Sequence, residues 1–489
     1  MSLSPFITRE IDWSHPIEAF RAFASIPFAH LFHGGEKSQI EQKEQPGLSP
    51  RQQASRWSFI VANPVTNIIY QGGAFWIDGA RSDASFDEVI RAHLRTQTFS
   101  SPIPFLSGLA GFIGYESAAL FEPSLELPPS PYALPDIALG RYEGVIIFDR
   151  WNERSFVCGL NARAVDELCE IIKDTHLQTS RPSNDENPDL SNGFEQNLTV
   201  SSNFDRGSYK DAVEQVREAI LNGDFFQTNL TRRIIVDITG LEHFNNDHIE
   251  MFARIMDKSD ACYGACLQFD EGIILSNSPE KFFSLSLQEN GRLKLIAEPI
   301  KGTIARDSDP AKDKELRDLL KNNPKDRAEN IMIADLLRND MSRVCDFDSI
   351  AEEEICAVLS LTHVHHLVSR ITGTLCSGYD SVDVLRALFP CGSITGAPKV
   401  EAMKIIASTE KTGRGPYCGA IGYIDDRGSA DFSVSIRTMM KMFEKNSHNV
   451  SIPVGGGITL RSDPNSEYEE TSLKARALMS MFNIDPDIY

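Results

Sequence analysis

Lys301 is the first of two ionisable residues in this 489-residue chain for which the sequence predicts poor hydration. It follows Pro299 and Ile300 in a short extended run, which predicts the end of a strand. An amine in apolar company loses hydration, which favours its neutral, nucleophilic form. A surface turn is the alternative interpretation of this segment.

Glu329 is the second residue, and it lies in a helical pattern that begins near Lys325. Apolar residues occur all round this helix, so we expect the helix to be buried and Glu329 to be buried with it. A buried carboxylate needs a cation or a metal ion. A metal site is one interpretation, and an arginine partner is the other.

A glycine run and a polar helix near the C-terminus add further candidate groups. Gly455, Gly456 and Gly457 follow a predicted strand, so their N–H groups can approach an anion closely, although a plain glycine bulge is equally compatible. The next helix carries four polar residues on one face: Glu467, Glu470, Thr471 and Lys474. The lower half of this face is apolar, which predicts that its carboxylates point inward toward Glu329. An exposed ion pair between Glu470 and Lys474 is the alternative.

Short apolar runs separated by turn residues predict the elements that position these groups. Strands are expected at residues 59–62, 108–115, 144–148, 225–236 and 272–280, and a helix at residues 209–222. Paired strands mixed with helices favour an α+β fold with antiparallel sheets. We expect an N-terminal region at residues 1–174, a polar linker or loop at 175–206 and a catalytic domain at 207–489, with a second polar insert at 37–53.

Composition and charge exclude several classes of protein. The chain is 41% hydrophobic and has no apolar stretch approaching the roughly 18 residues of a membrane span, so we expect a cytoplasmic protein that does not bind membranes. The nine cysteines include no CxxC pair, which favours reduced thiols. A net charge of −21 repels nucleic acid, and it means that an anionic substrate needs local positive charge. Residues 392–399 lack the spacing of a phosphate loop.

Six motifs within residues 207–482 together resemble the chorismate-utilising enzymes, the family that includes anthranilate synthase component I. They are Pro299-Ile300-Lys301-Gly302-Thr303, Asp326-Arg327-Ala328-Glu329-Asn330 with Asp335-Leu336-Leu337-Arg338-Asn339-Asp340, His366-Leu367-Val368-Ser369, Gly392-Ser393-Ile394-Thr395-Gly396-Ala397-Pro398-Lys399, Cys418-Gly419-Ala420-Ile421-Gly422-Tyr423 and Glu467-Tyr468-Glu469-Glu470-Thr471. Residues 55–59 and 111–115 carry a weaker likeness. The resemblance implies two antiparallel β-sheets packed as a sandwich, with flanking helices outside and a Mg²⁺ site in the cleft.

The resemblance also implies a role for individual positions. The metal ligands fall on Glu329 and Glu470, with Glu467 close by through water, a set that suits Mg²⁺. Lys301 is implied as a covalent nucleophile, Glu280 as the acid that protonates the departing hydroxyl, and His366 as an orienting group. The implied substrate contacts are Gln227, Gly302, Thr303, Ser393, Thr395, Tyr417, Arg437, Gly455, Gly456, Gly457 and Lys474.

Two positions select among the chemistries of the family. Relatives that add water to chorismate have a lysine where this chain has Gln227, and a glutamine cannot deprotonate water. Relatives that make anthranilate typically have alanine at the position of Lys301. The resemblance therefore implies that chorismate is aminated at C4. Amination at C2 with loss of pyruvate and a non-catalytic chorismate-binding subunit are the alternatives, and the end use, folate or an antibiotic precursor, is left open.

The source of ammonia and a second pocket complete the expectations. We find no segment with a reactive cysteine in a strand-to-helix elbow and a downstream His-x-Glu, so we expect a separate glutamine amidotransferase subunit to supply ammonia. The tryptophan-holding pocket of the family maps to Gly34, residues 54–57 and residues 262–264. Gly34 and Cys262 depart from the usual Ser and Pro, so the sequence predicts neither bound tryptophan nor feedback inhibition.

Overall fold

The computed structural model describes residues 6–35, 55–95, 97, 101–178, 198–239, 241, 247–257, 261–361, 363–443, 448–482 and 484. The polar insert expected at residues 37–53 lies outside the described residues, as does most of the linker expected at 175–206. In the part of the chain that is described, no helix is long and apolar enough to cross a membrane.

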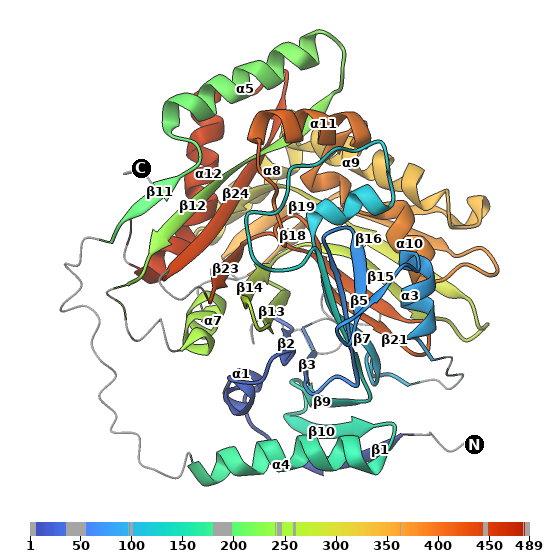
Figure 1. Cartoon of the computed structure of the whole chain (residues 1–489). Helices are drawn as coiled ribbons and strands as arrows, with labels where there is room; N and C mark the ends of the chain where they lie inside the picture. Colours follow the sequence, from blue (N-terminus) through green and yellow to red (C-terminus); the bar gives the residue numbers. More distant parts are fainter. Residues whose placement is uncertain are drawn as a thin grey trace.

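Two large antiparallel sheets form the body of the molecule (Figure 1). In spatial order, the first contains β1 (Ile7–Ile11), β10 (Arg154–Gly159), β9 (Gly144–Asp149), β3 (Trp57–Val61), β2 (His30–His33), β13 (Tyr263–Gln268), β14 (Gly272–Ser278), β23 (Thr438–Met442), β24 (Asn449–Thr459), β12 (Gln227–Asp237) and β11 (Val200–Ser202), with β20 (Gly396–Ala397) beside β12. The second contains β17 (Ile300–Ala305), β19 (Val364–Thr374), β16 (Leu293–Glu298), β15 (Lys281–Leu287), β22 (Ala430–Val434), β21 (Ala420–Asp425), β7 (Gly108–Ile113), β8 (Ile137–Tyr142), β4 (Thr66–Gln71), β5 (Ala74–Ile77) and β6 (Ala80–Ser82), with β18 (Ala351–Ser360) beside β19. The predicted α+β fold with antiparallel sheets is confirmed.

The two sheets pack face to face, as the side chains of β9 show. Val145 and Ile147 lie in a core that also contains Leu109 of the second sheet, whereas Ile146 and Phe148 enter a separate core beneath the helices. Successive side chains of a strand point to opposite faces, so a strand covered on both faces needs an unbroken apolar run. The continuous apolar sequence of β9 therefore follows from its place between a sheet and a helical layer.

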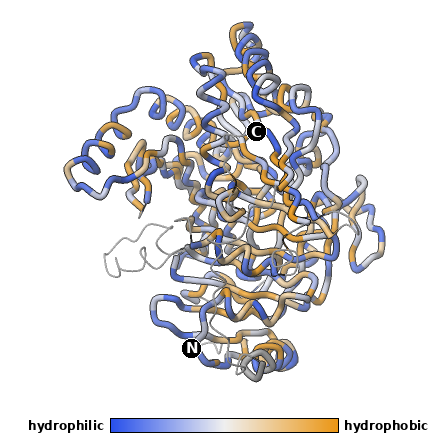
Figure 2. Tube along the Cα trace, turned by 90° about the vertical axis from the view of Figure 1, so that its left-hand side faces the viewer, coloured by the Kyte–Doolittle hydropathy of each residue, from blue (hydrophilic) through white to orange (hydrophobic). Residues whose placement is uncertain are grey.

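Helices cover the outer faces of both sheets (Figure 1). The first sheet is covered by α1 (Pro16–Phe20), α4 (Ala162–Gln178), α7 (His248–Asp257) and α12 (Pro464–Met479), with α5 (Arg206–Leu221) against α12 and α11 (Lys399–Glu410) against β12. At the second sheet, α8 (Pro310–Asn322) and α9 (Pro324–Met341) lie over β17, β18 and β19, and α10 (Ser381–Leu388) lies between α9 and α3 (Phe86–Ala92). The inner strands are mostly hydrophobic, and the outer helices carry long hydrophilic stretches (Figure 2).

Both sheets contain strands from the N-terminal region and from the rest of the chain. Leu31 of β2 pairs with Cys266 of β13, and Phe112 of β7 pairs with Ile421 of β21. The boundary expected at residues 175–206 therefore does not divide the sheets, because strand pairing between distant segments joins the two regions.

The helix that carries Glu329 is buried on one side only, which corrects the expectation of a helix buried all round. It begins after Asn323, whose side chain accepts two backbone N–H groups of the first turn. Ile333 and Leu337 are buried, whereas Ile331 is 46% exposed. The reason is that α9 belongs to the outer layer, where only one face of a helix meets a sheet.

Candidate active site

Lys301 lies in a strand and not in a surface turn. It is the second residue of β17, and its side chain is half-buried. Its Nζ donates a 2.9 Å hydrogen bond to the carbonyl oxygen of Ser393, in the short helical turn η5 (Gly392–Ile394). Because the acceptor is a backbone carbonyl, the bond orients the amine without pairing it with a carboxylate.

Gly302 allows β17 to pass closely against α9. Its φ of +83° lies in the left-handed region, and a Cβ at this position would lie 2.9 Å from the Cβ of Asp326. The pairing of β17 with β19 also shifts register between Ile300 and Thr303. The glycine thus brings the Lys301 segment against the first turn of α9, about one turn before Glu329.

Thr303 and His366 form a cross-strand pair beside Lys301. They are register partners in β17 and β19, and Thr303 Oγ1 lies 2.8 Å from His366 Nδ1. His366 is 1% exposed, so the bond fixes a buried ring next to the strand of the amine. This geometry is compatible with the orienting role expected for His366.

The glycines of β24 lie between the amine and the acidic residues. A Cβ on Gly457 would lie 2.5 Å from Nε2 of Gln227 and 3.8 Å from Nζ of Lys301. A Cβ on Gly456 would lie 3.3 Å from Oε2 of Glu467. The strand pairs with β12 in unbroken one-to-one register through these positions, which excludes the bulge. A side chain at either position would therefore displace the end of Gln227 or of Glu467.

Glu467 and Glu470 lie on α12, one turn apart. Glu467 is 2% exposed, and burial raises the pKa of its carboxyl group. Glu470 forms the ion pair that was the alternative interpretation, with Lys474 Nζ 2.7 Å from its Oε1 and side chains 42% and 43% exposed. The charge of Lys474 lowers the pKa of Glu470. Lys474 also donates to the carbonyl oxygen of Gly455 at 2.9 Å, so this pair is anchored to the glycine strand.

Glu329 faces the same region from α9, and it is half-buried and not fully buried as expected, because α9 lies in the outer layer. Burial raises the pKa of its carboxyl group, against the opposing charges of Lys301 and Lys325. Its Oε1 is buried and accepts no hydrogen bond from the described residues, and the same is true of Oε2 of Glu467. Two buried carboxylate oxygens without donors are suited to a cation. Within the described ranges, no three His, Cys, Asp or Glu side chains are close enough to enclose a metal ion by themselves.

Glu280 follows the end of β14, as the sequence predicts. It is 4% exposed, and its backbone N–H donates to Ser278 Oγ at 3.2 Å. Burial, followed by the negative charge of Glu280, raises the pKa of the Cys391 thiol to about 12. The carboxyl group of Glu280 therefore lies near the segment that leads into η5 and its Lys301 acceptor.

Thr395 supports the site through its backbone and hydroxyl contacts. Its Oγ1 donates to the carbonyl oxygen of Cys391 at 2.9 Å, and its own carbonyl oxygen accepts the N–H of Asn229 at 2.7 Å. The buried Arg414 donates to the carbonyl oxygens of Ile394 and Asn229 at 3.0 and 2.8 Å. These bonds hold the η5 segment against β12.

Three other residues were predicted to contact the substrate: Gln227, Tyr417 and Arg437. Gln227 is 1% exposed at the start of β12, and its Oε1 accepts no hydrogen bond from the described part of the protein. Tyr417 is buried, and burial raises the pKa of its hydroxyl well above the ordinary value. Arg437 lies between β22 and β23, where its carbonyl oxygen accepts the N–H of Asn277 at 3.1 Å. Their contacts with substrate stay predictions.

Sequence reasoning missed Arg232, which anchors the acidic helix. This fully buried residue of β12 donates to Thr471 Oγ1 and to Ser472 Oγ, each at 2.8 Å. The signal was present in the alternation of the strand, because Arg232 shares its face with Leu230 and Ile234, which are both buried.

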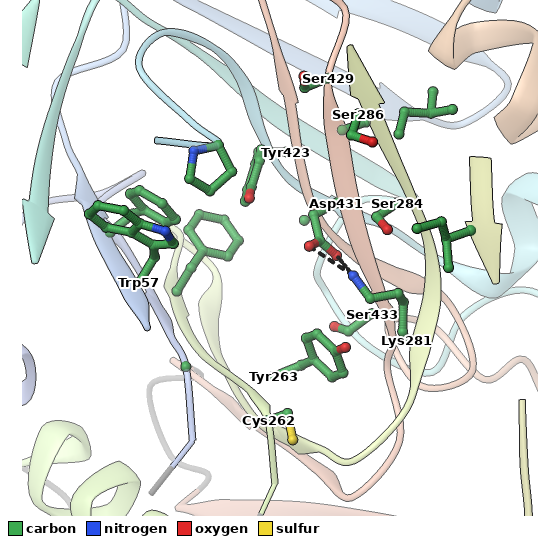
Figure 3. A pocket seen from close by; sticks show the side chains of 18 of the residues that line it. Trp57, Cys262, Tyr263, Lys281, Ser284, Ser286, Tyr423, Ser429, Asp431 and Ser433 are labelled. Carbon is green, nitrogen blue, oxygen red and sulfur yellow. Dashed lines mark hydrogen bonds and ion pairs between the residues drawn. The ribbon is translucent and has the colours of Figure 1, made fainter. Parts of the chain in front are cut away.

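A cavity with a different lining corresponds to the second pocket of the family. It has a volume of about 450 Å³ and is lined in part by Gly34, Trp57, Cys262 and Gly264, the positions expected for the family's second pocket. Lys281 and Asp431 form an ion pair at 2.9 Å on its wall (Figure 3). Residue 54 of that expectation lies outside the described residues.

The sandwich and the cluster at its edge correspond to a known class of enzymes. The fold is shared with the crystal structure of anthranilate synthase component I from Streptococcus pneumoniae, with a TM-score of 0.74, 27% sequence identity and coverage of 90% of this chain and 94% of that one. Residues 45–480 match the model of the chorismate binding enzymes, and the chain belongs to this family of chorismate-utilising enzymes.

Two curated relatives are similar over most of their length. Aminodeoxychorismate synthase component 1 of Salmonella typhimurium is 33% identical over 490 residues, which cover 98% of each chain. Anthranilate synthase component 1 of Aquifex aeolicus is 34% identical over 385 residues, which cover 78% of this chain and 75% of the relative. The chain is thus similar to enzymes that catalyse two different reactions. The residues of the candidate site are needed to choose between these reactions for this chain.

Proposed function

We propose that the protein aminates chorismate at C4 and releases 4-amino-4-deoxychorismate, in the cytoplasm and in the route to para-aminobenzoate and folate. The near full-length similarity to aminodeoxychorismate synthase component 1 supports this reaction. The observation that carries the proposal is the amine of Lys301, half-buried beside Gln227 and Gly457 at the position where relatives that make anthranilate typically have alanine.

Lys301 acts as the nucleophile of the proposed reaction. Its neutral Nζ attacks C2 of the ring, both conjugated double bonds shift, the C4–O bond breaks, and the hydroxyl leaves as water with a proton from Glu280. Ammonia then attacks C4, both double bonds shift back, and the C2–Nζ bond breaks as Nζ takes up a proton equivalent to the one that the added ammonium loses. The hydrogen bond to the backbone carbonyl of Ser393 supports this role, because it orients the amine and its acceptor carries no negative charge.

Glu329, Glu467 and Glu470 are the proposed ligands of Mg²⁺. This ion prefers octahedral coordination by oxygen. It usually binds one or two protein carboxylates directly and keeps several water molecules as its other ligands. The donor-free oxygens of Glu329 and Glu467 support the assignment. When bound, Mg²⁺ supplies positive charge to the ring carboxylate of a dianionic substrate. Lys474, Arg437 and the backbone of Gly455, Gly456 and Gly457 are the proposed partners of the other polar groups of chorismate.

Ammonia is proposed to come from a separate glutamine amidotransferase subunit. The relatives' designation as component 1 supports a second component. The assay can bypass that subunit, because free ammonium replaces its product.

The test is an assay of the purified chain with chorismate, Mg²⁺ and ammonium, followed by mass spectrometry of the products. We expect 4-amino-4-deoxychorismate. Anthranilate, which has lost pyruvate and is fluorescent, would instead assign C2 amination. Absence of turnover at any ammonium concentration would assign a non-catalytic chorismate-binding subunit. A parallel reaction with a chelator measures the dependence on Mg²⁺.

A further inference from the structure

Lys325 reaches from the protein surface to a buried carboxylate of the acidic cluster. Its Nζ lies 3.5 Å from Oε1 of Glu467. The lysine side chain is 44% exposed, whereas that of Glu467 is 2% exposed. One partner of this ion pair can therefore move into solvent, and the other cannot.

The same ammonium group lies on the helix face of a second acid. Lys325 and Glu329 are four residues apart on α9, so they share one face of the helix. One positive charge thus lies beside proposed Mg²⁺ ligands from both helices, Glu467 of α12 and Glu329 of α9.

The contact is loose enough to be exchanged. Charge-assisted N–H···O bonds are typically about 2.7–2.9 Å long, and the distance of 3.5 Å to Glu467 is longer. A lysine ammonium is a compact point charge on a flexible stem, without the fork geometry by which arginine locks carboxylates. A divalent cation carries twice the charge of the ammonium group, so at the same distance it attracts these carboxylate oxygens more strongly.

We propose that Lys325 is a displaceable counter-ion of the Mg²⁺ site: its ammonium group neutralises Glu467 and Glu329 and swings into solvent when a divalent cation binds. This inference rests on the Mg²⁺ site of the proposed function. Lys325 and the metal compete for the same carboxylates, so the lysine weakens metal binding and stabilises the metal-free protein. It is a residue that sets the metal affinity and is not a ligand.

The experiment is a calorimetric titration of the full-length chain with MgCl2 in the absence of chorismate, on matched lysine variants. Lys325→Met removes the charge and keeps the length of the side chain. Lys321→Met removes an equal charge from an exposed position in the last turn of α8 and corrects for the change in net charge. Lys325→Gln serves if the methionine variant fails to fold. Lys325→Arg keeps the charge and adds a fork.

The expected result is tighter Mg²⁺ binding only in the variant that loses the charge at position 325. Relative to Lys321→Met, Lys325→Met binds Mg²⁺ more tightly by about tenfold, which corresponds to one favourable charge contact. Lys325→Arg binds it no more tightly than the unmodified protein. In a chelator, Lys325→Met also melts at a lower temperature than Lys321→Met, and saturating Mg²⁺ removes the difference.

Failure of the inference and failure of the proposed metal site give different results. Equal affinities of Lys325→Met and Lys321→Met, with normal binding by the unmodified chain, would overturn the counter-ion role alone. No binding by the unmodified chain, together with no binding by Lys325→Met, would overturn the metal site itself.

Discussion

The side chain of Lys301 donates a 2.9 Å hydrogen bond to the backbone carbonyl of Ser393. The bond links β17 of the second sheet to η5, which the contacts of Thr395 and Arg414 hold on β12 of the first sheet. The amine is therefore set at the junction of the two sheets. Its charge lowers the pKa of Glu329 and of Glu470, whereas its hydrogen bond is to the carbonyl oxygen of Ser393.

Replacement of Lys301 tests the covalent role. We expect Lys301→Ala and Lys301→Arg to lose roughly a thousandfold or more in C4 amination with ammonium, because alanine has no nucleophile and a guanidinium is never neutral. Product formation is measured by mass spectrometry, and Lys312→Ala on the exposed face of α8 is the control. An unchanged rate in Lys301→Ala would remove the covalent step.

Gly457→Ala tests the close approach of β24 to the site. The added Cβ would lie 2.5 Å from Nε2 of Gln227, so the amide must move, and it would lie 3.8 Å from Nζ of Lys301, in van der Waals contact with the amine. We expect kcat to fall by roughly ten- to a hundredfold, since small displacements at a reacting group have effects of this size. Gly207→Ala in α5, where the nearest atom is 3.4 Å from the new Cβ, is the matched control. Equal rates in the two variants would contradict the packing argument.

Glu329→Gln tests whether the site carries a stability cost. The pKa of Glu329 is raised in the folded state, so the folded protein favours the protonated form. Its contribution to stability is full below the unfolded pKa of about 4.3 and is lost as pH rises through the folded pKa. In a chelator we expect the glutamine variant to melt on the order of 2 °C higher than the unmodified chain, with a larger gap at higher pH. Mg²⁺ should raise the melting temperature of the unmodified chain but not that of the variant; the opposite pattern would argue against Glu329 as a ligand.

Glu116 is expected to lower the free energy of unfolding as the pH rises. Its carboxylate oxygens accept the backbone N–H groups of Arg414 and Gly415 at 2.6 and 2.9 Å, yet burial dominates and raises its pKa to about 7. Because the unfolded pKa is about 4.3, the contribution is lost progressively between these two values. Urea unfolding from about pH 5 to about pH 8 should therefore show a steeper decline in the unmodified chain than in Glu116→Gln. Glu126→Gln, at an exposed position, should keep the full slope.

Local sequence patterns predicted several helices and strands and the side chains on their faces, because the periodicity of side chains within one element depends only on neighbouring residues. The apolar run at residues 144–148 becomes β9, and the face of α12 that carries Glu467 and Glu470 turns toward Glu329. Lys301 lies in an extended segment for the same reason. The residue-by-residue roles came from the family resemblance and not from these patterns.

Other features depend on pairings between distant segments and could not be read from periodicity. The sharing of both sheets by the two regions rests on β2–β13 and β7–β21, whose partners are far apart in the sequence. The exposure of Ile331 follows from the place of α9 in the outer layer, which is set by its contacts with the distant strands β18 and β19. The contact of Lys325 with Glu467 joins two helices more than a hundred residues apart.

The pairing of β7 with β21 has a consequence for synthesis of the protein. The two strands are about 300 residues apart in the chain. At roughly 5–20 residues per second, β7 leaves the ribosome tens of seconds before its neighbour exists. Its unpaired edge must be shielded during that interval. We therefore expect the soluble yield in a foreign host to depend on chaperone supply and on the rate of translation.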